Sequence, residues 1–89
     1  MKDRRLKIGL VSMHIVASWG KDIAIKVKEA IPDSSIILKN EEDFKTASMG
    51  FLIHDESFEN VPDGEACPKV LLDIPLNDKQ PKPRLIYNH

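Results

Sequence analysis

Short apolar segments separated by polar ones predict four strands along the chain. Residues 6–11 are almost continuously apolar and rich in branched side chains, which is typical of a strand buried on both faces. Three further runs of this kind predict strands at 35–39, 49–53 and 69–74. Four strands joined by connections of about 10–25 residues indicate one small domain.

A segment of different period separates the first two predicted strands. Its apolar side chains recur at three- and four-residue spacing and are Trp19, Ile23, Val27, Ala30 and Ile31. This pattern predicts an amphipathic helix that packs on the sheet. We expect residues 12–17 to be a connector, Ser18 to cap the helix, and Pro32 to end it at Ile31.

The rest of the chain predicts shorter elements. Residues 40–48 indicate a second helix, because Asn40 can cap it and acidic residues fill its first turn. Residues 55–68 contain many turn formers and predict a loop. A strand at 84–87 follows a connection too short for a parallel crossover, so we expect it to be antiparallel or at the sheet edge.

A strand, a helix and a strand in succession predict a βαβ unit with parallel pairing and a right-handed crossover. The expected fold is one α/β domain over residues 1–89, with a mainly parallel, flavodoxin-like open sheet of order 2-1-3-4 in two or three layers. The fifth strand would complete this sheet as an antiparallel or edge strand. The same chain could also be the N-terminal domain of a longer protein.

Composition narrows the classes of function. The 13 basic and 14 acidic residues give a net charge of −1, and no aromatic residue except Tyr87, near Arg84, is interleaved with the basic ones, so a nucleic-acid interface is not indicated. No apolar run approaches the roughly 20 residues of a membrane span. Cys67 is the only cysteine, which fits a reducing compartment. We therefore expect a cytoplasmic protein without membrane contact.

The carboxyl ends of the predicted parallel strands are where a ligand would bind. His14 follows the first strand, His54 and Asp55 follow the third, and Asp73 closes the fourth. Imidazole and carboxylate groups at one crevice could bind a divalent metal or small ligand, although a solvated rim is the competing interpretation. Complete phosphate-binding or nucleophile motifs are absent from the sequence, so we expect no cofactor and name no catalytic residue; a non-enzymatic role is favoured, and enzymatic activity stays open.

Exposed apolar and acidic side chains point to a protein partner. Ile25 is expected on the polar side of the helix, and Phe58 stands between Glu56 and Glu59 in the loop. These four residues are the candidate partner contacts, although single exposed apolar residues are common on protein surfaces. Self-association into a homodimer stays open.

The order of elements, with Asp55 directly after the third strand segment 51–54, resembles response-regulator receiver domains. In that family this aspartate accepts a phosphoryl group. The resemblance departs at residues 12–14, where an acidic pair should hold magnesium, and at 74–75, where a Ser or Thr should close the fourth strand; the family's lysine is not evident at 87–89. The chain therefore looks like a degenerate receiver, as found ahead of MinD-like ATPases of pilus assembly and localisation, where the module makes protein contacts.

The sequence supports three hypotheses for function. The first is a non-catalytic protein-interaction or regulatory module. The second is a domain that binds a small ligand or divalent metal at the strand ends. The third is a small inhibitor whose acidic loop, residues 55–65, docks on a basic partner surface.

Overall fold

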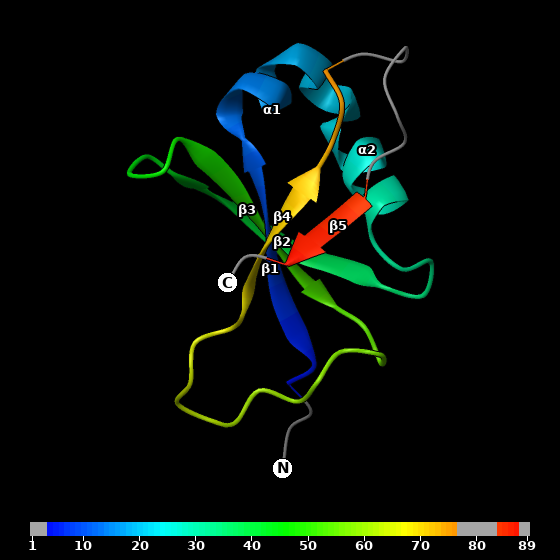
Figure 1. Cartoon of the computed structure of the whole chain (residues 1–89), viewed down its shortest axis with the longest axis vertical. Coiled ribbons are helices and arrows are strands. Elements are labelled where there is room, and N and C mark those ends of the chain that lie inside the picture. Colours follow the sequence, from blue (N-terminus) through cyan, green and yellow to red (C-terminus); the bar gives the residue numbers. More distant parts are fainter. Residues whose placement is uncertain (1–3, 77–83, 88–89) are drawn as a thin grey trace.

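The computed structural model describes residues 4–76 and 84–87. The elements in chain order are β1 (Leu6–Ser12), α1 (Met13–Trp19), the 3₁₀ segment η1 (Gly20–Asp22), α2 (Ile23–Ala30), β2 (Ile36–Asp43), β3 (Ser48–His54), β4 (Lys69–Asp73) and β5 (Arg84–Tyr87). The strands form one sheet of order β2-β3-β1-β4-β5, and the helical segment packs on one of its faces (Figure 1). The described chain therefore has two layers.

The prediction of a mainly parallel sheet of order 2-1-3-4 is wrong. β3 lies between β1 and β2 and is antiparallel to both. β4 is parallel to β1 on its other side, and β5 is antiparallel to β4 at the edge of the described sheet. β1 and β2 still run in the same direction, because each opposes β3. The unit is therefore a split βαβ arrangement with β3 inserted between its two strands.

A hairpin in place of the predicted second helix causes this difference. β2 extends to Asp43, a turn occupies residues 44–47, and β3 begins at Ser48. The Asp43 carboxylate accepts a hydrogen bond of 3.0 Å from the backbone amide of Lys45, which stabilises a turn at the point where the helix was expected. A connection this short can join only antiparallel strands. The acidic residues therefore belong to a strand and its turn.

The helical segment begins earlier than the spacing predicts. Ser12, not Ser18, caps it: the Ser12 hydroxyl accepts a hydrogen bond of 3.2 Å from the amide of His14. Gly20 then interrupts the helix with a φ of 60°, a conformation that glycine adopts without steric cost. The predicted end is confirmed, because Ile31 before Pro32 is extended.

The core lies between the helical segment and the covered face of the sheet. Its most deeply buried apolar side chains are Val11, Val27, Phe51, Ile53 and Val70. Each side chain of this size contributes about 1.5–3 kcal/mol when it leaves water. The helices therefore bury only one of the two faces of the sheet.

The turn between β2 and β3 contains a residue whose replacement should stabilise the protein. Ala47 has a φ of 51°, and a non-glycine residue in this region costs about 1–2 kcal/mol. We predict that Ala47→Gly raises the free energy of unfolding by about 0.5–1 kcal/mol, after the greater flexibility of unfolded glycine is subtracted. Urea denaturation measures this change. The control Ala17→Gly, in exposed helix, should lower the same quantity by up to about 1 kcal/mol; equal effects of the two substitutions would contradict the prediction.

Candidate functional site

The four residues predicted at a common strand-end site do not come together. His14 lies in the first turn of α1, beyond the end of β1. His54 pairs with Leu6 at the start of β1, because β3 runs antiparallel, so His54 and Asp55 lie at the opposite end of the sheet from His14. Asp73 ends β4 at the His14 end. Across the described ranges, 4–76 and 84–87, no group of three His, Cys, Asp or Glu residues is placed to hold a metal ion.

Asp55 is buried and hydrogen-bonded, so its carboxylate serves to hold the fold together. The residue is only 2% exposed, and its carboxylate accepts hydrogen bonds from the Ser34 hydroxyl at 2.5 Å, from the Ser57 amide at 2.9 Å and from the Ser57 hydroxyl. The hydrogen bonds from Ser34 and then from Ser57 hold the pKa of this carboxyl below its ordinary value. Asp55 thereby joins the segment before β2 to the segment after β3.

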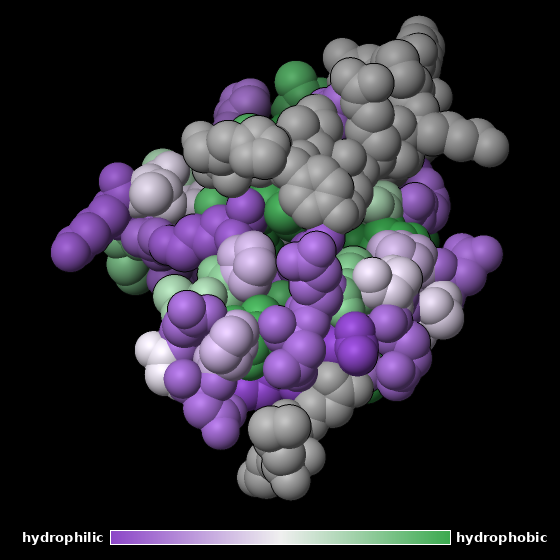
Figure 2. Space-filling view, turned by 60° about the horizontal axis from the view of Figure 1, so that its bottom comes forward, coloured by the Kyte–Doolittle hydropathy of each residue, from purple (hydrophilic) through white to green (hydrophobic). Residues whose placement is uncertain are grey.

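The loop of residues 55–68 is fixed by the basic start of the chain. The Arg5 guanidinium donates a hydrogen bond of 2.7 Å to the carbonyl oxygen of Phe58, and Arg4 donates one of 2.6 Å to that of Pro62. This loop forms the end of the molecule at which both β1 begins and β3 ends, and hydrophilic side chains dominate the view from there (Figure 2). Two arginine side chains therefore hydrogen-bond to the backbone of the acidic loop.

The candidate partner contacts differ in accessibility. Phe58 is 3% exposed and belongs to the core, with the Lys7 ammonium 4.5 Å from the centre of its ring, so its side chain cannot anchor a partner. Glu56 and Glu59 are exposed in the same loop. Ile25 is 59% exposed on α2, as the helical spacing predicts. Its role as a partner contact stays a prediction.

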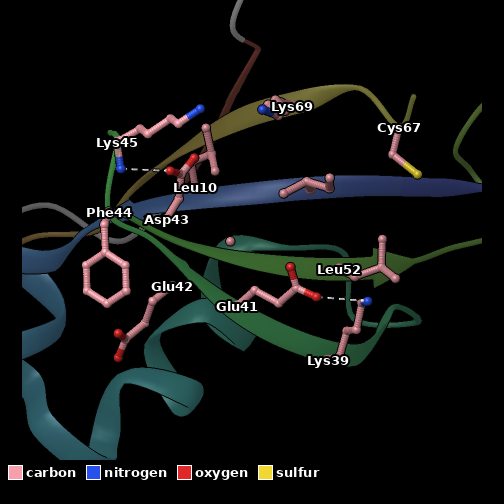
Figure 3. Close-up of a pocket in the computed structure, with 12 residues that line it drawn as sticks. Leu10, Lys39, Glu41, Glu42, Asp43, Phe44, Lys45, Leu52, Cys67 and Lys69 are labelled. Carbon is pink, nitrogen blue, oxygen red and sulfur yellow. Dashed lines mark hydrogen bonds and ion pairs between the residues drawn. The ribbon is translucent and has the colours of Figure 1, made fainter. Parts of the chain in front are cut away.

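The face of the sheet opposite the helices is apolar, a feature absent from the expectations drawn from the sequence. Ile8 and Leu10 of β1 and Leu52 of β3 are half-buried there, and Leu71 of β4 is 46% exposed. Ile8, Leu10 and Leu52 line a concavity of about 670 Å³ that lies over β1 and β3 and is bordered by β2 and β4 (Figure 3). We call this surface the open face.

Gly50 makes the hollow in the open face. A Cβ atom at this position would lie 3.1 Å from Ile8 Cγ2 and 3.6 Å from Leu10 Cδ2. The missing side chain therefore leaves a gap between its neighbours on β1. Because Gly50 is not among the glycines with positive φ, its backbone conformation does not demand glycine.

Charged side chains of both signs border the open face. Lys39 and Glu41, both on β2, form an ion pair of 3.0 Å (Figure 3). Burial opposes ionisation of Asp43, but hydrogen bonds from Thr46 and Lys45 outweigh it and hold the pKa of Asp43 below its ordinary value. Lys69 stands at the start of β4. The result is an apolar centre within a charged rim.

The hydrogen bonds to Asp55 predict an acid-dependent contribution to stability. Because its folded pKa lies below the unfolded value of 3.8, ionised Asp55 stabilises the fold above that value, and this stabilisation is lost as pH falls through the folded pKa. We predict that Asp55→Asn lowers the free energy of unfolding at neutral pH and that this deficit shrinks below about pH 4. Urea denaturation between about pH 2 and pH 7 measures the deficit. Ser34→Ala, which removes one donor, should weaken the pH dependence; a deficit that is constant with pH would count against this role.

Comparisons with known proteins give no relative. No family model, curated protein or solved structure matches the chain. In the described part of the chain, no helix is long and apolar enough to cross a membrane. The mixed sheet lacks the parallel order on which the receiver resemblance depended, so no functional proposal is based on that resemblance.

Proposed function

We propose that this chain is a non-catalytic protein-interaction module and that the open face is its binding surface. One observation carries the proposal: apolar side chains of two neighbouring strands, Ile8 and Leu10 of β1 and Leu52 of β3, line a concavity on the face opposite the helices. A contiguous apolar patch with a polar rim is the usual form of a protein interface.

The charged groups at the rim favour binding over proton transfer. Lys39 is paired with Glu41, and Asp43 accepts hydrogen bonds from its own turn, so these groups already serve the structure of the hairpin. Cys67 is half-buried at the border of the concavity, and its sequence neighbours include only one cation, Lys69. These rim residues therefore support the binding of a partner's surface rather than a catalytic reaction.

The two other hypotheses have weaker support in the geometry. The side chains proposed for a metal or small ligand, His14 and His54 among them, lie at opposite ends of the sheet. The acidic loop holds Arg4 and Arg5 against its backbone, which offsets the negative charge that a basic partner would recognise. The open face is therefore the better candidate.

Site-specific photocrosslinking tests the proposal in a lysate of the source organism. We predict that p-benzoyl-phenylalanine at position 71, on the open face, gives a discrete protein adduct, because a bound partner would cover Leu71. The matched control carries the same group at Ala17, which is exposed on α1 in the opposite layer of the molecule and is not a candidate partner contact. No adduct at position 71, or the same adducts at both positions, would reject the open face as the binding surface.

A further inference from the structure

We infer that the middle of the 55–68 loop is a lid, which opens as a unit while the sheet stays folded. The lid comprises residues 56–66, and Arg4 and Arg5, just before β1, form the clasp that keeps it closed. The closed lid covers two apolar side chains, Phe58 and Val61. This inference does not depend on the proposed function, because it concerns the loop beside the start of β1 (Figure 1) and not the apolar side chains of the open face.

The Arg4 guanidinium lies among backbone carbonyl groups of the lid. Its Nη1 donates hydrogen bonds to the carbonyl oxygens of Pro62 at 2.6 Å and Val61 at 3.4 Å, and its Nη2 donates one of 3.3 Å to that of Glu65. The main chain of Arg4 adds two bonds: its amide donates to Asn60 Oδ1 at 2.8 Å, and its carbonyl accepts from the Val61 amide at 3.0 Å. One residue therefore holds the second half of the lid.

Arg5 holds the first half of the lid through the carbonyl oxygen of Phe58, to which its guanidinium donates a hydrogen bond of 2.7 Å. Phe58 is 3% exposed and Val61 is 6% exposed, whereas every other residue of the lid is exposed. The lid is thus closed by two apolar side chains, and the carbonyl group of each accepts a hydrogen bond from an arginine of the clasp.

The lid has little structure of its own. It contains neither a helix nor a strand, and its internal backbone hydrogen bonds close two short turns. The Phe58 amide donates to the carbonyl oxygen of Asp55 at 3.1 Å, and the Glu65 amide donates to that of Pro62 at 3.1 Å. A segment with few buried apolar side chains and an exposed backbone opens at a lower free energy than the core of a domain.

Packing between the lid and β1 is incomplete. A hollow of about 400 Å³ is lined by one residue of β1, two of the lid and one that follows the lid: Lys7, Ser57, Glu59 and Pro68. The lid therefore does not contact the strand along its whole length, which leaves the clasp and the two apolar side chains to hold it.

Both ends of the lid are attached to the sheet independently of the arginine side chains. Before the lid, Asp55 is buried and accepts a hydrogen bond of 2.5 Å from the Ser34 hydroxyl. After the lid, the carbonyl oxygen of Pro68 accepts one of 2.8 Å from the Ile8 amide. The lid can therefore open between these two points without loss of the pairing of β1 with β3 and β4.

The geometry of the clasp demands arginine and not merely a positive charge. Three carbonyl oxygens receive hydrogen bonds from two nitrogens of one planar guanidinium. A lysine ammonium carries its donors on a single nitrogen and does not reproduce this fork. The acceptors are uncharged, so a lysine at position 4 would keep the charge beside the acidic loop and lose the clasp.

Amide hydrogen exchange of the whole chain, followed by NMR at low urea concentrations, tests whether the lid opens independently. We expect the amides of Phe58, Val61 and Glu65 to be less protected than sheet amides such as those of Phe51 and Ile53. Their exchange should be nearly independent of urea, because a local opening exposes little surface. Lid amides with the urea dependence of the sheet amides would overturn the inference, and this measurement needs no variant.

Two substitutions test the clasp. Arg4→Gln and Arg4→Lys should each raise the exchange rates of the Phe58, Val61 and Glu65 amides at least about tenfold, because hydrogen bonds from a charged donor are lost. Unchanged lid exchange in Arg4→Gln would rule out Arg4 as the clasp. Wild-type lid exchange in Arg4→Lys alone would show that charge, and not the fork, holds the lid, and would reject the clasp as described.

Ala17→Gly is the matched control for a general loss of stability. Ala17 is exposed on α1, beyond the end of β1 that is opposite to the lid. This substitution should speed exchange of the sheet amides, which requires global unfolding, and leave the lid amides unchanged, because opening of the lid does not involve α1. An equal acceleration of lid and sheet amides in Ala17→Gly would mean that the lid opens only with the whole fold, contrary to the inference.

Discussion

The structure depends on β1, a central strand that is hydrogen-bonded on both sides and apolar on both faces. β3 and β4 flank it, Val11 faces the helices, and Ile8 and Leu10 face the opposite way. A strand of this composition is stable when both faces are covered. In the described chain, the helical segment 13–30 covers one face, so the apolar character of the other is left to face solvent or another molecule.

The sequence alone predicted where most strands lie along the chain, but it did not predict their order in the sheet. Periodicity predicted the strands near 49–53 and 69–74 and the end of the helix before Pro32, because these features depend on local chemistry. Strand order depended on whether residues 40–48 formed a helix or a hairpin. Asn40 and the acidic residues suit a helix start, but pairing with β3 and a local turn at Asp43 prevailed. Pairing of this kind comes from tertiary contacts that local propensity does not contain.

The error in order also displaced the candidate site. His54 and Asp55 were placed beside His14 on the assumption that all strands end on one side, and the reversal of β3 moved them to the other end. Exposure of Ile25 followed from helical spacing and was predicted correctly, whereas burial of Phe58 depends on long-range contacts with Lys7 and Arg5. One signal could have indicated the open face: residues 6–11 are apolar on both faces, and only one segment of the sequence had a strong amphipathic helical pattern.

Gly50 is the residue that the isolated domain explains least well. It lies in the middle of a strand without a positive φ, where glycine is less favourable than alanine by roughly 0.5–1 kcal/mol. A Cβ there would require a small adjustment of Ile8 rather than a rearrangement of the backbone. A glycine in a strand is expected where another surface approaches closely. The hollow at Gly50, bordered by Ile8 and Leu10, thus agrees with the proposed interaction, in which a second surface packed against the sheet would offset the cost of this glycine.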